Sequence, residues 1–180
     1  MVTYQDVLSF WFDELTPASW YKKDAQLDQL IQTRFGATHQ AALACELFEW
    51  RARPEGRLAE IIVLDQFSRN IYRDDYRSFA ADSLALALAQ EAVAMTWDHQ
   101  LALEQRPFIY MPFMHSESAK IHNLAVTLFS QQGMEQSLLF ERRHKEIIDR
   151  FGRYPHRNAI LQRESTAEEL EFLQQPGSSF

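Results

Sequence analysis

The fold is decided by the stretch Pro54-Glu-Gly-Arg-Leu-Ala-Glu-Ile-Ile-Val-Leu-Asp-Gln-Phe-Ser-Arg-Asn-Ile-Tyr72. From about Glu55 to Tyr72 it predicts a helix, because proline is tolerated in a first helical turn and apolar side chains lie nearly all round the rest. A helix of this kind is usually the buried centre of a domain. The sequence therefore predicts a helical protein built around this segment.

Helical patterns continue on both sides of this segment, and no stretch shows the alternation typical of a β-strand. Thr3 and Asp98 are predicted N-caps, and Ser165 and Thr166 are each followed three residues later by a glutamate, as in a capping box. The chain has only 5 glycines, which disfavours a many-turned β fold and a phosphate-binding loop. The expected helices lie at about 3–12, 24–50, 55–72, 78–95, 116–131, 135–151 and 166–173.

The composition is that of a soluble globular protein. The chain has 180 residues, of which 46% are apolar and 24% charged, so we expect one domain over residues 1–180, with a tail at 174–180 that frays. The net charge of −7 disfavours binding to nucleic acid or to an anionic membrane. No run approaches the roughly 18 apolar residues of a membrane span, and the N-terminus lacks a signal-peptide pattern. Cys45, the single cysteine, fits a reducing compartment, so we expect a cytoplasmic protein.

Charged residues on apolar helix faces are the informative feature of this sequence. At about 100° per residue, Asp65, Arg69 and Arg73 continue one stripe of the central helix, which begins apolar at Leu58. Buried charges must be paired and hydrogen-bonded, because an unpaired ion costs roughly several kcal/mol in a protein interior. We therefore expect Asp65 and Arg69, with Asn70 beside them, to have partners.

Two later helices show the same pattern. Glu117 lies on the predicted stripe of Leu124, and His144 lies on the predicted stripe of Phe140 and Ile147. We therefore expect both polar side chains to point toward the interior.

Further polar residues gather in two turns. His115 stands two residues before Glu117. Gly152 can supply a left-handed helix cap and Pro155 prevents the helix from continuing, so the segment that follows is expected to be a rigid loop. This segment concentrates Arg150, Arg153, His156, Arg157 and Asn158.

We expect these groups to meet at one site. The basic residues and histidines outnumber the carboxylates among them, which indicates a vacant anion site, and a structural ion-pair network explains the whole set equally well. For Asp65 and Arg69 alone, a network that fixes helix register is the favoured interpretation. Arginine forks match carboxylate and phosphate oxygens, so the leading hypothesis is binding of a small anionic ligand or an acidic peptide terminus. The candidate residues are Asp65, Arg69, Asn70, Arg73, His115, Glu117, His144, Arg153, His156, Arg157 and Asn158.

Other functions remain open on this evidence. His115, Glu117, His144 and His156 are suitable metal ligands, but arginines nearby oppose a cation, so no metal site is predicted. An enzyme, such as a hydrolase, would use His144 or His115 for proton transfer, although no nucleophile motif is present and no cofactor is indicated. An interaction scaffold would use the polar residues only to hold its structure.

Long motifs carry a resemblance to a known family. They are Phe10-Trp11-Phe12, Trp20-Tyr21-x-x-Asp24, Leu64-Asp-Gln-Phe-x-Arg-Asn70, Phe108-x-Tyr-Met-Pro-Phe-x-His-Ser-Glu117 and Arg150-Phe-Gly-Arg-x-Pro-His-Arg-Asn-x-x-Leu161. With these motifs the chain resembles the bacterial "domain of unknown function 924" family from Val7 to Leu173. The resemblance implies an all-helical, tetratricopeptide-like bundle of antiparallel helix pairs, and it implies no established reaction.

The family's motifs coincide with the candidate site. Carried over residue by residue, they include all the candidate residues together with Gln66 and Ser116. One departure follows Leu161, where the family usually has Gly-Arg and this chain has Gln162-Arg163. A special backbone conformation at that position is therefore in doubt.

Overall fold

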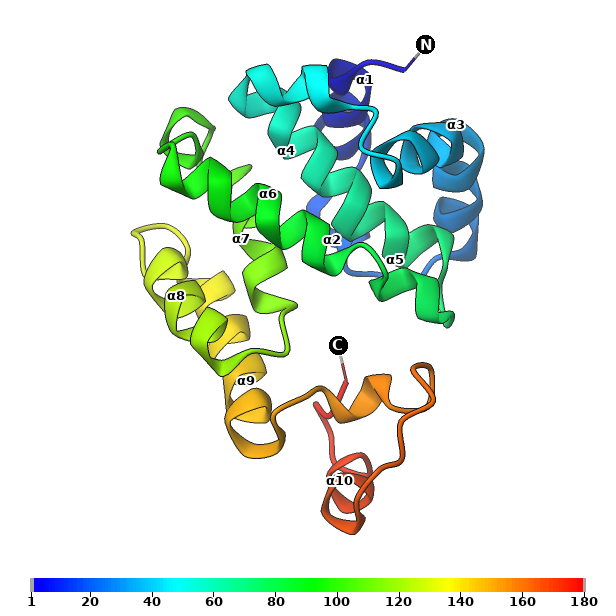
Figure 1. Ribbon diagram of the computed structural model, residues 1–180, viewed down its shortest axis with the longest axis vertical. Helices are drawn as coiled ribbons and strands as arrows, with labels where there is room; N and C mark the ends of the chain where they lie inside the picture. The colour runs from blue at the N-terminus through cyan, green and yellow to red at the C-terminus, as the bar shows by residue number, and fades with distance from the viewer. Residues whose placement is uncertain (1, 180) are drawn as a thin grey trace. The chain divides into compact units, whose positions relative to one another are not determined.

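The computed structural model describes residues 2–179, which form helices joined by turns and short loops (Figure 1). No β-strand occurs between residues 2 and 179, so the all-α prediction is confirmed. Met1 and Phe180, which the predicted domain includes, lie outside the described residues. The α-helices are α1 (Tyr4–Ser9), α2 (Pro17–Trp20), α3 (Ala25–Leu43), α4 (Pro54–Ile62), α5 (Ser68–Ile71), α6 (Asp82–Ala94), α7 (Arg106–Met114), α8 (Ala119–Phe129), α9 (Glu135–Phe151) and α10 (Ala167–Phe172). The shorter elements are the π-helical turns η1 (Phe10–Glu14) and η3 (Val63–Phe67) and the 3-10 helices η2 (Phe48–Ala52), η4 (Tyr76–Phe79), η5 (Asp98–Gln100) and η6 (Pro155–Arg157).

The predicted caps that rest on local chemistry are present. Thr3 and Asp6 form a reciprocal capping box at the start of α1, and Thr166 and Glu169 form another at α10. Gly152 ends α9 with a φ of 69°, in the left-handed region. Each cap satisfies backbone groups that a helix end leaves without a partner.

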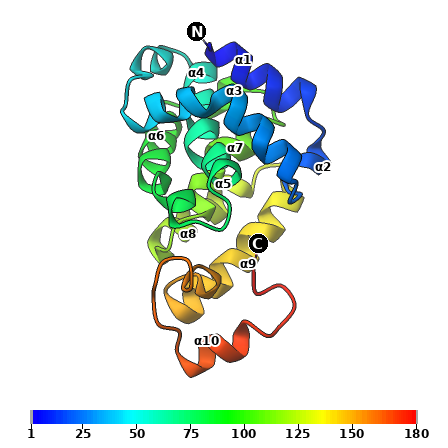
Figure 2. The same ribbon diagram turned by 90° about the vertical axis from the view of Figure 1, so that its right-hand side faces the viewer.

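The central helix is buried as predicted. It consists of α4, η3 and α5 in direct succession, and every residue from 56 to 68 is buried. The π-helical turn η3 in its middle carries Asp65, and turns of this kind occur frequently at functional sites. In unit 1, defined below, this segment contacts α1, α3 and α6 (Figures 1 and 2).

The largest boundary differences concern two predicted helices. The helix expected over 24–50 ends at Leu43, because Cys45 takes a left-handed φ of 59° and the chain continues as η2, which packs against α4. The helix expected from Ser78 begins at Asp82, after the 3-10 helix η4.

Two other predicted features also differ. Asp98 does not cap a helix but begins the 3-10 helix η5, and it accepts a hydrogen bond from the Tyr110 hydroxyl at 2.5 Å. The tail predicted to fray is folded back over residues 174–179: Ser178 is buried and donates to the Leu173 carbonyl.

The chain forms two compact units. Unit 1 comprises Met1–Arg73 and Arg77–Pro112, and unit 2 comprises Asp74–Tyr76 and Phe113–Phe180. Unit 1 has an aromatic core in which Phe10, Phe35 and Phe67 contact one another. In unit 2, α8 packs along α9. The single-domain organisation stays a prediction.

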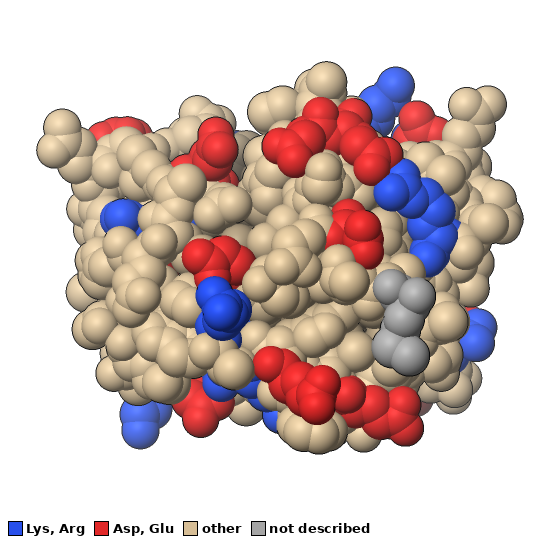
Figure 3. All heavy atoms as spheres, turned by 90° about the horizontal axis from the view of Figure 1, so that it is seen from above, with Lys and Arg blue, Asp and Glu red and all other residues tan. Residues whose placement is uncertain are grey.

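One face of the surface carries its charge in patches. Figure 3, which looks onto the side of the N-terminus, shows acidic and basic patches that adjoin one another among uncharged residues. Within residues 2–179, no helix has both the length and the apolar character needed to cross a membrane.

Candidate functional site

In unit 1, Arg69 joins two carboxylates. Asp65, in η3, is 1% exposed, and its Oδ1 lies 3.2 Å from Arg69 Nη1. The same nitrogen donates to the Asp65 carbonyl oxygen at 2.8 Å. Both terminal nitrogens of Arg69 donate to the Asp82 carboxylate, each at 3.0 Å. Because Asp82 is the first residue of α6, this fork ties α5 to α6.

The other two candidates of unit 1, Asn70 at the end of the central helix and Arg73 just after it, share one partner, Asp28 of α3. Arg73 donates to the two Asp28 oxygens at 2.5 and 2.7 Å, and Asn70 donates to Oδ1 at 2.8 Å. Burial alone would raise the pKa of Asp28, but the bonds from Arg73 and Asn70 outweigh it and the pKa lies below its usual value. Asp28 is therefore an ionised partner that ties α3 to the end of the central helix.

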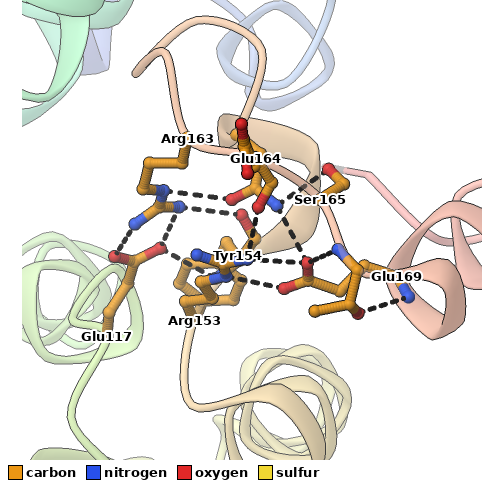
Figure 4. Close-up of polar contacts among 9 residues, drawn as sticks. Glu117, Arg153, Tyr154, Arg163, Glu164, Ser165 and Glu169 are labelled. Atoms are coloured by element: carbon orange, nitrogen blue, oxygen red, sulfur yellow. Dashed lines mark hydrogen bonds and ion pairs between the residues drawn. The ribbon is translucent and has the colours of Figure 1, made fainter.

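In unit 2, Glu117 holds the loop after α9. Its carboxylate accepts two bonds from Arg163, at 2.6 and 2.9 Å, and one from the Tyr154 backbone N–H at 2.7 Å (Figure 4). Burial raises the pKa of Glu117, but these bonds together hold it below its usual value. Glu117 precedes α8 rather than lying on it, so its predicted helical stripe is wrong, and Leu124 on that stripe is 49% exposed.

Glu169 of α10 organises the same loop from its other end. Arg153 donates to both Glu169 oxygens, at 2.6 and 2.7 Å (Figure 4). Asn158 donates to Oε2 at 3.3 Å. The Arg153 bonds are the main reason that the pKa of Glu169 falls to about 2. Arg153 and Asn158 therefore fix the loop to α10.

A buried polar chain connects α8, α9 and Tyr154. His122 and Glu141 are both 0% exposed, and His122 Nδ1 lies 2.8 Å from Glu141 Oε1. His122 Nε2 donates to the Ser116 carbonyl at 2.8 Å and lies 3.2 Å from the Tyr154 hydroxyl. The Tyr154 hydroxyl donates to the Met114 carbonyl at 2.5 Å. Burial raises the pKa of Glu141 above its usual value, although the bond from His122 acts in the opposite direction.

Three candidate residues gather around Tyr154 and a fourth, His115, acts on the pKa of His144; we call His115, His144, His156 and Arg157 the basic cluster. The Arg157 guanidinium lies over the Tyr154 ring at 4.6 Å, and the ring centroids of His156 and His144 are 5.5 and 5.8 Å away. Arg157 and His144 are each 7% exposed. The pKa of His144 falls to about 3, mainly because of burial; the fields of His115, His122 and His156 contribute, and the bond to the Phe140 carbonyl opposes them.

Two comparisons agree with this architecture and these motifs. The model of the family described as "Bacterial protein of unknown function (DUF924)" matches residues 7–177. The chain belongs to this family. This chain is similar to a solved structure of a protein of unknown function, ATU0120 from Agrobacterium tumefaciens. The TM-score is 0.91 and the sequence identity 37%, over 95% of this chain and 96% of that one. No curated protein matches the chain.

The DUF924 resemblance seen in the motifs is therefore confirmed, whereas the tetratricopeptide-like arrangement stays a prediction. The structure brings the candidates together in two groups. In unit 1 they are Asp65, Arg69, Asn70 and Arg73, and in unit 2 they are His115, Glu117, His144, Arg153, His156, Arg157 and Asn158. That all the candidate residues meet at one site stays a prediction.

Several partners were missed by sequence reasoning. Asp82, Asp28 and Glu169 are the carboxylates that pair with Arg69, Arg73 and Arg153. The surplus of positive charge expected from the sequence was therefore too large, because these three acids were not counted. His122 could have been found from its spacing with Ala125 and Phe129, which are the other buried residues of α8. Over residues 2–179, no group of three or more His, Cys, Asp or Glu side chains is arranged to hold a metal ion.

Proposed function

We propose that this DUF924 protein binds a small anion, such as a carboxylate or phosphate, at the basic cluster of unit 2. The observation that carries the proposal is the gathering of Arg157, His144 and His156 around the ring of Tyr154. The Glu117 carboxylate is bonded to Arg163 and to the Tyr154 N–H, and the field of Arg157 helps to lower its pKa. An anion bound at the cluster would meet donors from Arg157 and from both histidines.

The chemistry of these side chains suits an oxyanion. An arginine presents several N–H donors in a planar fork, and imidazole nitrogens add further donors. A low local dielectric strengthens such bonds, and both Arg157 and His144 are 7% exposed. Tyr154 is itself 0% exposed, with its hydroxyl bonded to Met114, so the ring is a fixed support for Arg157.

A second role fits the candidates of unit 1. Arg69, Arg73 and Asn70 bond to Asp82 or Asp28, which lie on other helices. Ion pairs of this kind fix how helices pack, and removing one partner leaves the other charge uncompensated. We assign these residues to holding α3, α5 and α6 together, as in the scaffold alternative.

The setting of the proposed function is the cytoplasm. Cys45 is a free, exposed thiol, which fits a reducing compartment. The tetratricopeptide-like arrangement of antiparallel helix pairs belongs to the same proposal, and α8 and α9, joined by the five residues 130–134, support it.

The proposal is tested by thermal unfolding with added anions. Sulfate, phosphate and succinate are compared with chloride at equal ionic strength, because a ligand of the native state raises the melting temperature. At a concentration of 100 Kd, the stabilisation of about 2.7 kcal/mol corresponds to roughly 5–10 °C for a chain of this size. Arg157→Gln should abolish the shift, since it removes the charged fork.

Arg150→Gln is the matched control. Arg150 lies in the same segment but pairs with Glu168 on the surface, where the two side chains are 46% and 60% exposed. It should keep the full shift. If no anion stabilises the wild-type protein beyond chloride, or if both variants respond alike, the anion site is wrong. Turnover of a bound ester or phosphoester that depends on His144 or His115 would favour the enzyme alternative instead.

A further inference from the structure

We propose that unit 1 has a binding site of its own, for a small zwitterion of the α-amino acid type, in a hollow beside α1 and the start of α4. These two helices pack against each other (Figures 1 and 2). The hollow has a volume of about 480 Å³, which lies within the roughly 300–1,000 Å³ typical of small-molecule sites. All of its lining residues belong to unit 1, whereas the basic cluster belongs to unit 2. This inference therefore goes beyond the proposed anion site and does not depend on it.

The apolar side of the hollow is one stripe of α1 and η1. Tyr4, Leu8 and Phe12 all line the hollow, and they are spaced four residues apart, as neighbours on one helix face are. The Tyr4 ring meets the Trp50 ring edge-on at 6.2 Å, and the Phe12 ring meets the Phe108 ring edge-on at 5.4 Å. These contacts hold both ends of the stripe. The stripe therefore offers a fixed apolar surface to the side chain of a ligand.

The charged groups around the hollow have opposite signs. Arg53 and Glu55 line it at the start of α4, and Asp13 lines it from η1. Among residues 2–179, none of these three side chains forms an ion pair or a hydrogen bond. Because two carboxylates and one guanidinium surround the hollow, a simple anion is disfavoured there. A ligand that carries both a positive and a negative charge complements it.

The spacing of Arg53 and Glu55 suits the head group of an α-amino acid. The two residues are two positions apart, so their Cα atoms are separated by no more than about 7 Å, since a chain advances at most about 3.6 Å per residue. In an α-amino acid, the carboxylate and the ammonium are attached to the same carbon. The Arg53 fork binds the carboxylate, and the Glu55 carboxylate accepts hydrogen bonds from the ammonium. The side chain of the ligand then packs along Leu8 and Phe12.

Isothermal titration calorimetry with L-phenylalanine and L-phenylalaninamide tests the site on the full chain. The two ligands differ in one group, because the amide lacks the negative charge. At pH 6 both carry an ammonium, since the pKa of an α-amino group is roughly 7.7–8.0. Phenylalanine should bind the wild type about tenfold more tightly than the amide, because hydrogen bonds to charged groups are stronger than those to neutral groups.

Two variants identify the partners of the head group. Arg53→Gln should weaken the binding of phenylalanine about tenfold and leave that of the amide unchanged, so that the difference between the ligands disappears. Glu55→Gln should weaken both ligands to a similar degree, because both keep the ammonium. Arg142→Gln and Glu49→Gln are the matched controls, since both residues are exposed and neither lines the hollow. They should bind both ligands as the wild type does.

The folding of each variant is checked by circular dichroism, and it should be unchanged because Arg53 and Glu55 are exposed as well. Absence of phenylalanine binding to the wild type would overturn the inference, and so would equal affinities for phenylalanine and its amide. A tenfold difference that persists in Arg53→Gln would show that the carboxylate binds elsewhere, and the site would be wrong. Equal weakening by Arg53→Gln and Arg142→Gln would show an effect of net charge alone, with the same consequence.

The two proposals fail separately. Failure of sulfate, phosphate and succinate to stabilise the protein would overturn the anion site and leave the zwitterion site in place. Failure of phenylalanine to bind would overturn the zwitterion site and leave the anion site in place.

Discussion

Gln162 has a φ of 54°, in the left-handed region that favours glycine, and it directly precedes Arg163, the partner of Glu117. The sequence left a special backbone conformation in doubt here, because glutamine stands where the family usually has glycine. The structure shows that Gln162 adopts a left-handed conformation. The Arg163 bonds to Glu117 and to the Tyr154 carbonyl hold this turn in place.

Replacing Gln162 with glycine should therefore stabilise the protein. A left-handed residue with a side chain costs about 1–2 kcal/mol, from which the greater flexibility of glycine in the unfolded chain subtracts roughly 0.5–1 kcal/mol. We expect Gln162→Gly to raise the free energy of unfolding in urea by up to about 1 kcal/mol. Ala159→Gly, at an exposed position in the same loop, should lower it by about 0.5–1 kcal/mol. Equal effects of the two variants would show that Gln162 is not strained.

The candidate residues themselves were predictable, whereas most of their partners were not. Asp65 and Arg69 stand out because they continue an apolar stripe, and burial of charge demands a partner. Nothing in local spacing shows that Arg73 pairs with Asp28, since 45 residues separate them and helix periodicity describes only one helix at a time. His122 was missed because the stripe through Leu124 was taken as buried, and Leu124 is exposed.

At the scale of helices, two glycines in unit 1 have opposite roles. A Cβ added at Gly56, in α4, would overlap the backbone carbonyl of Trp50, where η2 packs against α4. A Cβ added at Gly36, in α3, would meet only the end of the Gln32 side chain, at 2.6 Å from its Nε2, and that side chain can move. The close approach of η2 to α4 therefore requires glycine at position 56. Position 36 does not require glycine, because its neighbour is a side chain that can move.

Alanine substitutions should separate the two glycines. Gly56→Ala forces backbone apart and should cost about 1–3 kcal/mol in urea unfolding, as overpacked cores do. Gly36→Ala gains helix propensity and should change stability by between zero and about 1 kcal/mol in the favourable direction. Loss of stability of equal size in both variants would contradict the close packing of η2 on α4.

Helix boundaries that depend on neighbouring residues were predictable, whereas one that depends on the packing of η2 against α4 was not. Thr3, Thr166 and Gly152 act through bonds to residues a few positions away, so their caps can be seen in the sequence. The end of α3 depends instead on Cys45, which takes a positive φ where η2 turns to pack on α4. No residue type is characteristic of a π-helical turn such as η3. The central helix was therefore predicted as one continuous α-helix.

At the scale of the whole chain, each unit buries a neutral histidine. His39 of α3 is 1% exposed and bonded to Ser68 at 2.8 Å, and burial lowers its pKa to about 4. Burial likewise lowers the pKa of His144 in unit 2 to about 3. An unfolded chain binds a proton at each histidine below about pH 6.5, whereas the folded chain does so only near pH 3–4.

Folding stability should therefore decrease as the pH falls below 6.5. The unfolded state binds more protons in this range, so the contribution of each histidine is fully present above pH 6.5 and is lost progressively toward its folded pKa. For His39 alone the loss at pH 5 is roughly 2 kcal/mol. Urea unfolding at pH 7.5 and at pH 5 gives two free energies of unfolding, and their difference measures this loss of stability. An effect of a substitution that is the same at both pH values cancels in the difference.

His39→Gln should reduce this difference by roughly 2 kcal/mol, because glutamine can still donate to Ser68 and does not titrate. His99→Gln, which replaces an exposed histidine of the same unit, should leave the difference unchanged. Glu169, with its pKa of about 2, loses its contribution only as the pH falls below about 4.5, and therefore does not obscure the comparison at pH 5. If His39→Gln unfolds with the same pH dependence as the wild type, His39 is not the buried neutral imidazole that its bond to Ser68 and its burial indicate.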